Sequence, residues 1–405
     1  MNEPSPVTSP RDRGFLLQNL AHFQTELARL VAGFIPGLKA WRARVEMPRH
    51  VFGDFRMVQD LRTRQKELGV ALGAVHLSRA VLLPELFALL GDAPSPESGC
   101  RAVYGRVKPR LAEFLGRVGE QEIGIYDLPS QPLIEANRDL LARQQAWASE
   151  VLGKGEASDG VFDDRIDQAL KGLETSLLQA ERPRAEPMKG PRRLGRLPLL
   201  DAALPDGFVA RTFRPERDSR DTSYSALEHH FAANFLQEVQ ASDSCASLLF
   251  DAPDLPWEFY FDCARHMWDE SRHSVFGEKK LEALGITKES VGLATTAYRL
   301  RQTLLPHDRY AALTTQEAEA FPNKHKGLRA ALDNNDSLGA MTWSYDIADE
   351  TQHVRYGQKW LPVLIAAAGD PRSLDQVRED ATHWRKVVLT VAYRATAAVA
   401  AESSS

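Results

Sequence analysis

Two nearly identical stretches in the second half of the chain combine acidic residues with histidine. They are residues 269–277 (DESRHSVFG) and 349–357 (DETQHVRYG), and both follow the pattern Asp-Glu-[Ser/Thr]-x-His-x-x-[Phe/Tyr]-Gly. They contain the only two Glu-x-x-His sequences in the chain. On a helix, a glutamate and a histidine three positions apart share one face, so both side chains can reach one metal ion. The two motifs therefore predict a metal centre carried by two helices.

Two further glutamates extend this pattern to four helices. A carboxylate metal centre in a helical bundle takes one extra glutamate from each of two partner helices. Glu238 precedes Glu270 by 32 residues, and Glu317 precedes Glu350 by 33. This near-constant spacing indicates a repeated helical hairpin, in which residues about thirty apart come to the same level. Glu319 is a rival to Glu317, but it lies about 200° round the helix and gives a less symmetric repeat.

The complete set of residues resembles the ligand set of the ferritin-like di-iron carboxylate proteins. The set is Glu238, Glu270, His273, Glu317, Glu350 and His353. The segments DESRHSVFGEKKLEALG and DETQHVRYGQKWL resemble bacterial ferritin-like proteins of uncharacterised function, the DUF455 type. The resemblance covers about residues 222–366 and implies a ferritin-like four-helix bundle. It is specific for the metal site and names no reaction.

The resemblance also implies a role for each ligand. Glu270 and Glu350 are expected to bridge two metals, and His273 and His353 to bind one metal each. The remaining two ligands, Glu238 and Glu317, are expected to be terminal or chelating. The aspartates before each motif glutamate, Asp269 and Asp349, are well placed to orient a histidine of the opposite hairpin, although a charged helix surface explains them equally well.

Charge and donor type indicate which metals suit these ligands. Four carboxylates inside a bundle are costly without counter-charge, and two divalent ions supply about four positive charges. Oxygen-rich ligation with one imidazole per metal suits iron or manganese better than zinc. We therefore expect two iron ions, two manganese ions or a mixed pair.

Several nearby residues share the stripe of predicted ligands. Tyr310 lies seven residues before Glu317 and is a candidate catalytic residue, although a core role is the commoner one for such a tyrosine. His266 and Asp346 lie one turn before the motif glutamates. They could be extra ligands or line a substrate channel, although the commoner role for such residues is a hydrogen-bonded position in the core. We expect His229 and His230 to be hydrogen-bonded or exposed.

The chain as a whole is expected to be all-α. Alternating β patterns are absent, and helical periodicity covers both halves. The predicted order begins with a disordered leader (residues 1–13), a metal-free helical domain (14–152) and a helical and Pro/Arg-rich connector (153–221). The metal-binding bundle (222–368) and a terminal helix with a Ser-rich tail (369–405) follow. In the N-terminal domain His50 and Asp54 lie one turn apart, and we interpret them as a surface pair.

Composition limits the compartment and the partners. The 405 residues carry a formal net charge of −5, which gives no reason to expect nucleic acid or an anionic membrane as a partner. Cys100, Cys245 and Cys263 form no Cys-x-x-Cys pair and suit a reducing cytoplasm. No apolar run is long enough for a signal peptide or a membrane helix. We expect a cytoplasmic protein without a membrane anchor, and the sequence also allows an oligomer.

Three functions are compatible with these features. The first is a di-metal oxidoreductase that activates dioxygen to oxidise or hydroxylate a small substrate, with an electron donor that the motifs do not identify. The second is metal handling, either iron storage or peroxide detoxification. The third is an interaction module that kept the bundle and lost the chemistry. The complete ligand set favours the first over the third, and the extra N-terminal half and long connector suit a ferritin cage poorly. The substrate stays open, because fold alone does not name a reaction.

Overall fold

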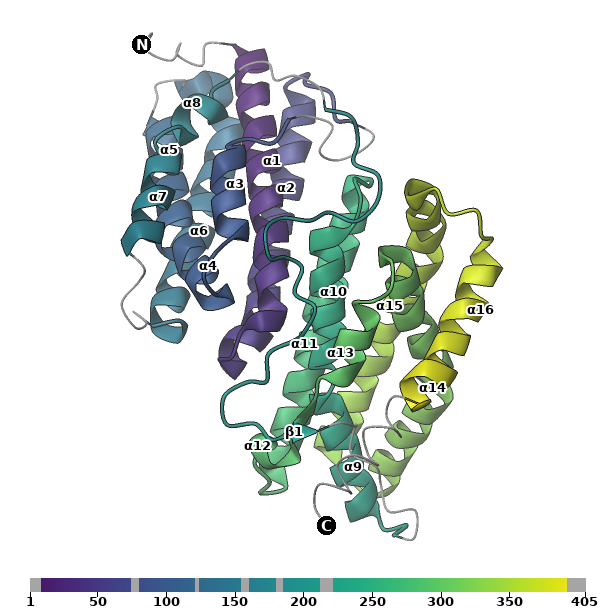
Figure 1. The fold of residues 1–405 in the computed structure, drawn as a ribbon. Helices are drawn as coiled ribbons and strands as arrows, with labels where there is room; N and C mark the ends of the chain where they lie inside the picture. The colour runs from purple at the N-terminus through teal and green to yellow at the C-terminus, as the bar shows by residue number, and fades with distance from the viewer. Residues whose placement is uncertain are drawn as a thin grey trace.

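The protein is almost entirely helical in the part of the chain that the structure describes. The computed structural model describes residues 9–73, 80–120, 124–153, 160–179, 185–211 and 221–391. In Figure 1 the N-terminal helices lie beside α10 and α11, and these lie beside α14 and α15. The all-α expectation is confirmed. Among the described residues, no helix is both long and apolar enough to cross a membrane.

The first half of the chain is built around two long helices. These are α1 (Pro10–Phe34) and α2 (Trp41–Glu67), which pack against each other. The shorter helices around them are α3 (Pro84–Gly91), α4 (Pro96–Ala102), α5 (Lys108–Glu120), α6 (Gln131–Val151), α7 (Gly160–Leu170) and α8 (Leu173–Leu177). Two 3-10 segments, Ile35–Gly37 and Gly124–Ser130, and one π-helical segment, Val103–Val107, complete this half.

Two sequence predictions for this half are wrong in detail. The leader was expected to reach residue 13, yet α1 begins at Pro10, because the Ser9 side chain accepts a hydrogen bond from the Asp12 amide and proline suits a first helical turn. Residues 1–8 lie outside the described part. The sequence also predicts a helix from about Val70 to Leu90, but Val70 to Gly73 is not helical, residues 74–79 lie outside the described part, and α3 begins only at Pro84.

The second half supplies two antiparallel helical hairpins. One hairpin joins α9 (Tyr224–Leu236) and α10 (Val239–Asp251) to α11 (Trp257–Ala283). The other joins α14 (Pro306–Asp333) to α15 (Ser337–Ala368). The hairpins meet where α11 contacts α15 and α10 contacts α14. The remaining elements are α12 (Lys288–Val291), α13 (Thr296–Arg301), α16 (Leu374–Trp384) and a π-helical turn (Arg385–Leu389).

The third ligand helix differs from its predicted extent. The sequence predicts a helix from about Glu289 to Phe321 with a candidate break at Pro306, followed by a long connection that contains some helix. The break is confirmed, because Pro306 occupies the first turn of α14, but the helix then continues through Pro322 to Asp333. Proline is tolerated in a first helical turn and normally interrupts a helix interior, which is why the sequence placed the end too early.

A small parallel pairing fastens the connection between the hairpins. Strand β1 (Ala210–Arg211) pairs with β2 (Leu293–Ala294). The side chain of Gln237 donates to the carbonyl of Gly292 and accepts from the amide of Ala294, both at 2.9 Å. Gln237 lies in the break between α9 and α10, so the strand pair is tied to that break.

One continuous apolar core extends through both halves of the molecule. Its largest cluster of buried residues includes members of α1 and α2 as well as of α10, α11, α14 and α15. Phe52 on α2 stacks on Trp268 of α11 with ring centroids 5.3 Å apart. Arg44 on α2 forms a buried ion pair with Asp243 on α10. The N-terminal helices therefore cover the outer face of the first ligand hairpin.

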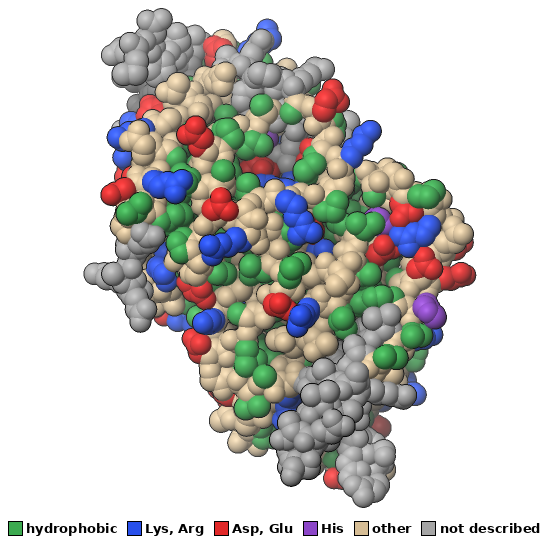
Figure 2. Space-filling model, in the orientation of Figure 1, with side chains coloured by type: hydrophobic (Ala, Val, Ile, Leu, Met, Phe, Trp, Pro, Cys, Tyr) green, Lys and Arg blue, Asp and Glu red, His purple; other side chains and the backbone are tan. Residues whose placement is uncertain are grey.

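The predicted connector contains two short helices followed by extended chain. Helices α7 and α8 occupy its first part, and residues 185–211 run irregularly across the helices. Arg192 in this stretch is buried and forms an ion pair with Glu26 of α1 at 3.0 Å. On the face drawn in Figure 2, acidic and basic side chains are interspersed, so that no single sign of charge dominates it.

Candidate metal centre

Three long helices and the break between α9 and α10 contribute to one cluster of carboxylates and imidazoles. Glu270 and His273 come from α11, Glu350 and His353 from α15, and Glu317 from α14. The sixth predicted ligand, Glu238, lies in the break between α9 and α10 and is the residue that precedes α10. The structure therefore brings all six predicted residues together in two adjoining groups.

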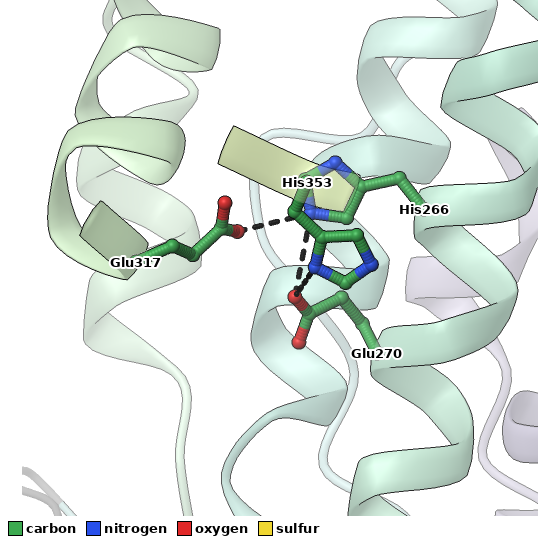
Figure 3. A group of neighbouring side chains, drawn as sticks. All are labelled: His266, Glu270, Glu317 and His353. Carbon is green, nitrogen blue, oxygen red and sulfur yellow. Dashed lines mark hydrogen bonds and ion pairs between the residues drawn. The ribbon is translucent and has the colours of Figure 1, made fainter. Parts of the chain in front are cut away.

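The first group combines two imidazoles with two carboxylates. It consists of His266, Glu270, Glu317 and His353, whose donor atoms all lie within 4.8 Å of one another. Nε2 of His266 is 3.0 Å from Oε1 of Glu317 and 3.3 Å from Oε1 of Glu270. Figure 3 shows His266 and Glu270 on one helix, with Glu317 facing them from another. The two histidine rings stack with centroids 3.8 Å apart.

The second group is richer in carboxylates. It joins two triads that share His273, one with Glu238 and Glu270 and one with Asp346 and Glu350, and the donor atoms within each triad lie within 4.8 Å of one another. Glu270 also belongs to the first group. Nδ1 of His273 is 3.2 Å from Oε2 of Glu238, 3.6 Å from Oδ1 of Asp346 and 3.8 Å from Oε2 of Glu270. His266 lies four residues before Glu270, and Asp346 lies four residues before Glu350. The two halves of the repeat therefore offer different donors at the same position, an imidazole in one and a carboxylate in the other.

The aspartates that precede the motif glutamates face the histidines of the opposite hairpin. Oδ2 of Asp349 is 3.2 Å from Nε2 of His273, and Oδ2 of Asp269 is 3.5 Å from Nε2 of His353. In both histidines Nδ1 faces the glutamates. Each imidazole therefore lies between the carboxylate cluster and an outer aspartate. This arrangement fixes ring orientation in metal sites generally.

Two arginines compensate the charge of these outer aspartates. Arg272 donates to Oδ1 of Asp269 at 2.8 Å and to Oδ2 of Asp349 at 2.6 Å, so it links the two hairpins. Arg265 donates to Oδ2 of Asp269 at 2.8 Å. Both guanidinium groups lie over the ring of Trp268. The outer aspartates are thus paired on one side with arginine and on the other with histidine.

A lysine that the sequence did not single out lies inside the second group. Nζ of Lys324 is 2.7 and 2.8 Å from the two oxygens of Asp346 and 3.0 Å from Oε1 of Glu350. Lys324 follows Glu317 by seven residues on α14, so helical spacing could have identified it. The helix predicted from the sequence ends at about Phe321, three residues before Lys324.

Burial and mutual contact shift the pKa values of the cluster in opposite directions. Burial, reinforced by the charge of Glu317, raises the pKa of Glu350 to about 8. Burial also raises the pKa of Asp346 to about 6, although Lys324 opposes the change. Burial acts to raise the pKa of Glu270 as well, but hydrogen bonds from His266 and the two motif histidines outweigh it and hold that pKa well below its usual range.

The imidazoles and the ammonium group respond to the same carboxylates. Burial would lower the pKa of His273, but contacts with Asp349, Glu238 and Glu270 raise it well above the ordinary value. Burial likewise would lower the pKa of Lys324, and Asp346 and Glu350 raise it instead. Without a metal, protons and one ammonium group balance the carboxylates. A metal ion that binds here would therefore take over this balance by displacing protons or the ammonium group.

Orphaned polar atoms show that the donors suit a cation. Oε2 of Glu317 and Oε2 of Glu350 are buried and have no hydrogen-bond partner among the described residues. Buried carboxylate oxygens are normally hydrogen-bonded, and a metal ion satisfies them equally well. The donor set contains carboxylates and imidazoles without thiolate, which suits iron or manganese. The identity of the metal stays a prediction.

The other residues named from the sequence lie in different surroundings. Tyr310 is buried, its ring is 6.0 Å from that of His266, and its hydroxyl has no hydrogen-bond partner in the described structure. Glu319 points outward and pairs with Arg385, so it is not part of the cluster. Nε2 of His230 is 2.9 Å from Nδ2 of Asn234, and His229 is exposed.

The His50 and Asp54 pair is buried, and the prediction of a surface pair is wrong. Asp54 forms an ion pair with Lys108 at 2.8 Å and accepts a hydrogen bond from Gln144 at 2.8 Å. Nδ1 of His50 is 3.3 Å from the hydroxyl of Tyr104. Helices α5 and α6 and the π-helical segment supply these partners, which local sequence spacing does not reveal. The pair is part of the packing of the N-terminal helices.

A cavity of about 690 Å³ leads to the cluster. Its floor includes glutamates of both groups, and its walls combine apolar side chains with a similar number of polar and basic ones. The floor residues are Glu238, Glu270, Glu317 and Glu350, and the walls include Leu227, Phe231, Phe235, Leu313, Trp343, Arg301, Gln316 and Lys324. A volume of this size is typical of sites for small organic molecules.

Comparison of the chain with protein family models, with curated proteins and with solved structures found no match.

Proposed function

We propose that this protein is a ferritin-like di-metal oxidoreductase that activates dioxygen to oxidise or hydroxylate a small organic substrate. One observation carries the proposal. Carboxylates and imidazoles from two repeated hairpins converge at the floor of a 690 Å³ cavity, with buried donor atoms that lack a protein partner. A substrate cavity that ends on the ligand set favours an enzyme over a purely structural bundle.

Each half of the ligand set has a proposed role. His266, Glu317 and His353 would hold one metal, and Glu238, His273 and Glu350 the other. Glu270 faces histidines of both groups, at 3.3 Å from His353 and 3.8 Å from His273, and is therefore proposed as a bridging ligand. Iron or manganese bound here would supply the redox chemistry needed to reduce dioxygen.

The chain's own contribution is positioning and exclusion of water. Asp269 and Asp349 hold Nε2 of the two motif histidines, so Nδ1 faces the carboxylate cluster. The apolar walls of the cavity, including Phe235 and Trp343, would surround the apolar body of a substrate. The fully buried Tyr310 lies beside His266 and remains the candidate catalytic residue outside the ligand set.

Metal analysis combined with oxygen uptake tests the proposal. The protein is purified without chelator, loaded anaerobically with iron, and assayed by elemental analysis and with an oxygen electrode. We expect about two metal ions per chain and oxygen consumption, both reduced in Glu270→Ala. Glu319→Ala is the matched control, because this glutamate lies on α14 close to Glu317 but pairs with Arg385 at the surface.

Three results would contradict the proposal, each in a recognisable way. Oxygen consumption that is unchanged in Glu270→Ala would remove the cluster from the reaction. Uptake of many iron ions per chain would favour storage. A wild-type protein that binds neither iron nor manganese, and whose melting temperature neither ion changes, would favour the interaction module.

A further inference from the structure

A buried ammonium group occupies part of the second ligand group. Lys324 is 7% exposed, and its Nζ contacts both oxygens of Asp346 and Oε1 of Glu350 at 2.7, 2.8 and 3.0 Å. An ammonium group has three donors and no lone pair, so these contacts use its full hydrogen-bonding capacity. Carboxylate oxygens that could bind a metal are therefore already engaged by a cation of the protein itself.

In the described part of the chain, no lysine or arginine occupies the first ligand group. Glu270 and Glu317 pair with histidines, and within the described ranges neither forms an ion pair with a lysine or arginine. Histidine is itself a metal ligand, so a metal entering this group can take over the existing contacts without any side chain leaving. In the second group, the ammonium of Lys324 must either withdraw or stay close to the metal and repel it.

We propose that Lys324 competes with metal for the second ligand group, so that the centre fills in two unequal steps. The first ion occupies the group of His266, Glu270, Glu317 and His353. The second ion binds more weakly, because it must displace the ammonium from Asp346 and Glu350. This inference rests on the proposed function only in requiring that the centre binds metal.

The structure provides a place for the displaced side chain. Lys324 lines the cavity above the cluster, and its four-carbon stem is flexible. Rotation toward the cavity would free the oxygens of Asp346 and Glu350 without a change in the helices. In the metal-free protein the same lysine neutralises two buried carboxylates, which would otherwise repel each other and Glu238.

Titration with Mn²⁺ tests the inference without any assay of activity. Metal-free protein is titrated, and free Mn²⁺ is measured by electron paramagnetic resonance, with calorimetry as a second readout. The wild type is expected to bind one ion tightly and a second ion more weakly. In Lys324→Met the affinity for the second Mn²⁺ ion should rise by about tenfold or more, because one positive charge that repels the ion is removed beside the site. Lys324→Gln is a second neutral variant that retains a hydrogen-bond donor.

Two further measurements separate competition from a merely structural role. Lys326 lines the same cavity and is exposed, so Lys326→Met should leave both binding steps unchanged. Metal-free Lys324→Met should melt at a lower temperature than the wild type, although it binds the second ion more tightly. A structural lysine would lower the melting temperature and weaken binding together.

The outcomes also separate this inference from the proposed function. Two equal steps in the wild type, or a second step that neither Lys324 variant tightens, would overturn the competition and leave the two-metal centre intact. Absence of Mn²⁺ binding in the wild type and in both variants would overturn the centre and the competition together. Binding that appears only in the Lys324 variants would support the competition in its strongest form.

Discussion

At the scale of single residues, the orientation of each motif histidine is set by groups on both of its sides. Nδ1 of His273 faces Glu238, and its Nε2 faces Asp349, which is itself held by Arg272. The arginine and the histidine approach the same carboxylate oxygen, so neither contact is independent of the other. Removing the charge of this aspartate should therefore loosen the imidazole without removing any proposed ligand.

Asp349→Asn tests this positioning role. We expect metal affinity to fall by about 10- to 100-fold, because ring orientation is lost while the ligands stay in place. The measurement is Mn²⁺ binding to the metal-free variant, with circular dichroism to verify the fold. Asp333→Asn is the control, since Asp333 is exposed at the end of α14. Unchanged affinity in Asp349→Asn would assign the aspartate to surface charge pairing alone.

At the scale of elements, the glycine that closes each motif lies where two helices approach closely. A methyl carbon added at Gly277 on α11 would lie 2.4 Å from the backbone nitrogen of Leu236 on α9. One added at Gly357 on α15 would lie 2.7 Å from Cβ of Thr314 on α14. The motif glycines therefore allow each ligand helix to pack tightly against its partner. This explains why Gly recurs four residues after the histidine in both halves.

Alanine substitutions at these glycines should reveal the close approach. Gly277→Ala is expected to lower the free energy of unfolding by about 1–3 kcal/mol, because rigid backbone atoms must move apart. Gly53→Ala in the interior of α2 should instead raise it by about 0.5–1 kcal/mol, since its nearest neighbour is 3.6 Å away and alanine favours helix. Chemical denaturation measures both. Equal effects of the two substitutions would contradict the packing argument.

At the scale of the whole molecule, the N-terminal helices and the ligand hairpins form one packed body. The core cluster is continuous, and the pair of Arg44 and Asp243 bridges α2 and α10 with side chains that are 1% and 0% exposed. Burial raises the pKa of Asp243, and Arg44 opposes that shift. Because both charges are desolvated, each depends on the other for compensation.

Arg44→Met should destabilise the entire molecule. The expected loss is about 3–5 kcal/mol of unfolding free energy, because Asp243 is left as an unpaired buried charge. Arg42→Met, two residues away, removes an exposed ion pair with Glu46 and should cost less than about 1 kcal/mol. Calorimetry should show one unfolding transition in each protein. Two separate transitions would indicate that the halves unfold independently.

Local sequence pattern was sufficient to predict the helical class and the six residues that converge. Periodic apolar positions set the helices, and the duplicated motif with its matching glutamates brought six residues to one place, because helical spacing and hairpin length are local properties. The DUF455-type resemblance, the reaction and the metal remain predictions. The spacing of residues was therefore enough to locate the cluster, but it did not identify every residue in it.

The place of Lys324 in the cluster follows from contacts between helices. Lys324 on α14 contacts Asp346 on α15. Helix α14 continues through Pro322 because its packing outweighs the local preference of proline to end a helix. The burial of His50 and Asp54 likewise depends on α5 and α6, which lie far away in the sequence. Spacing along one helix shows which residues share a face, as Lys324 and Glu317 do, but it does not show which side chains of another helix they contact, because those contacts arise from packing in three dimensions.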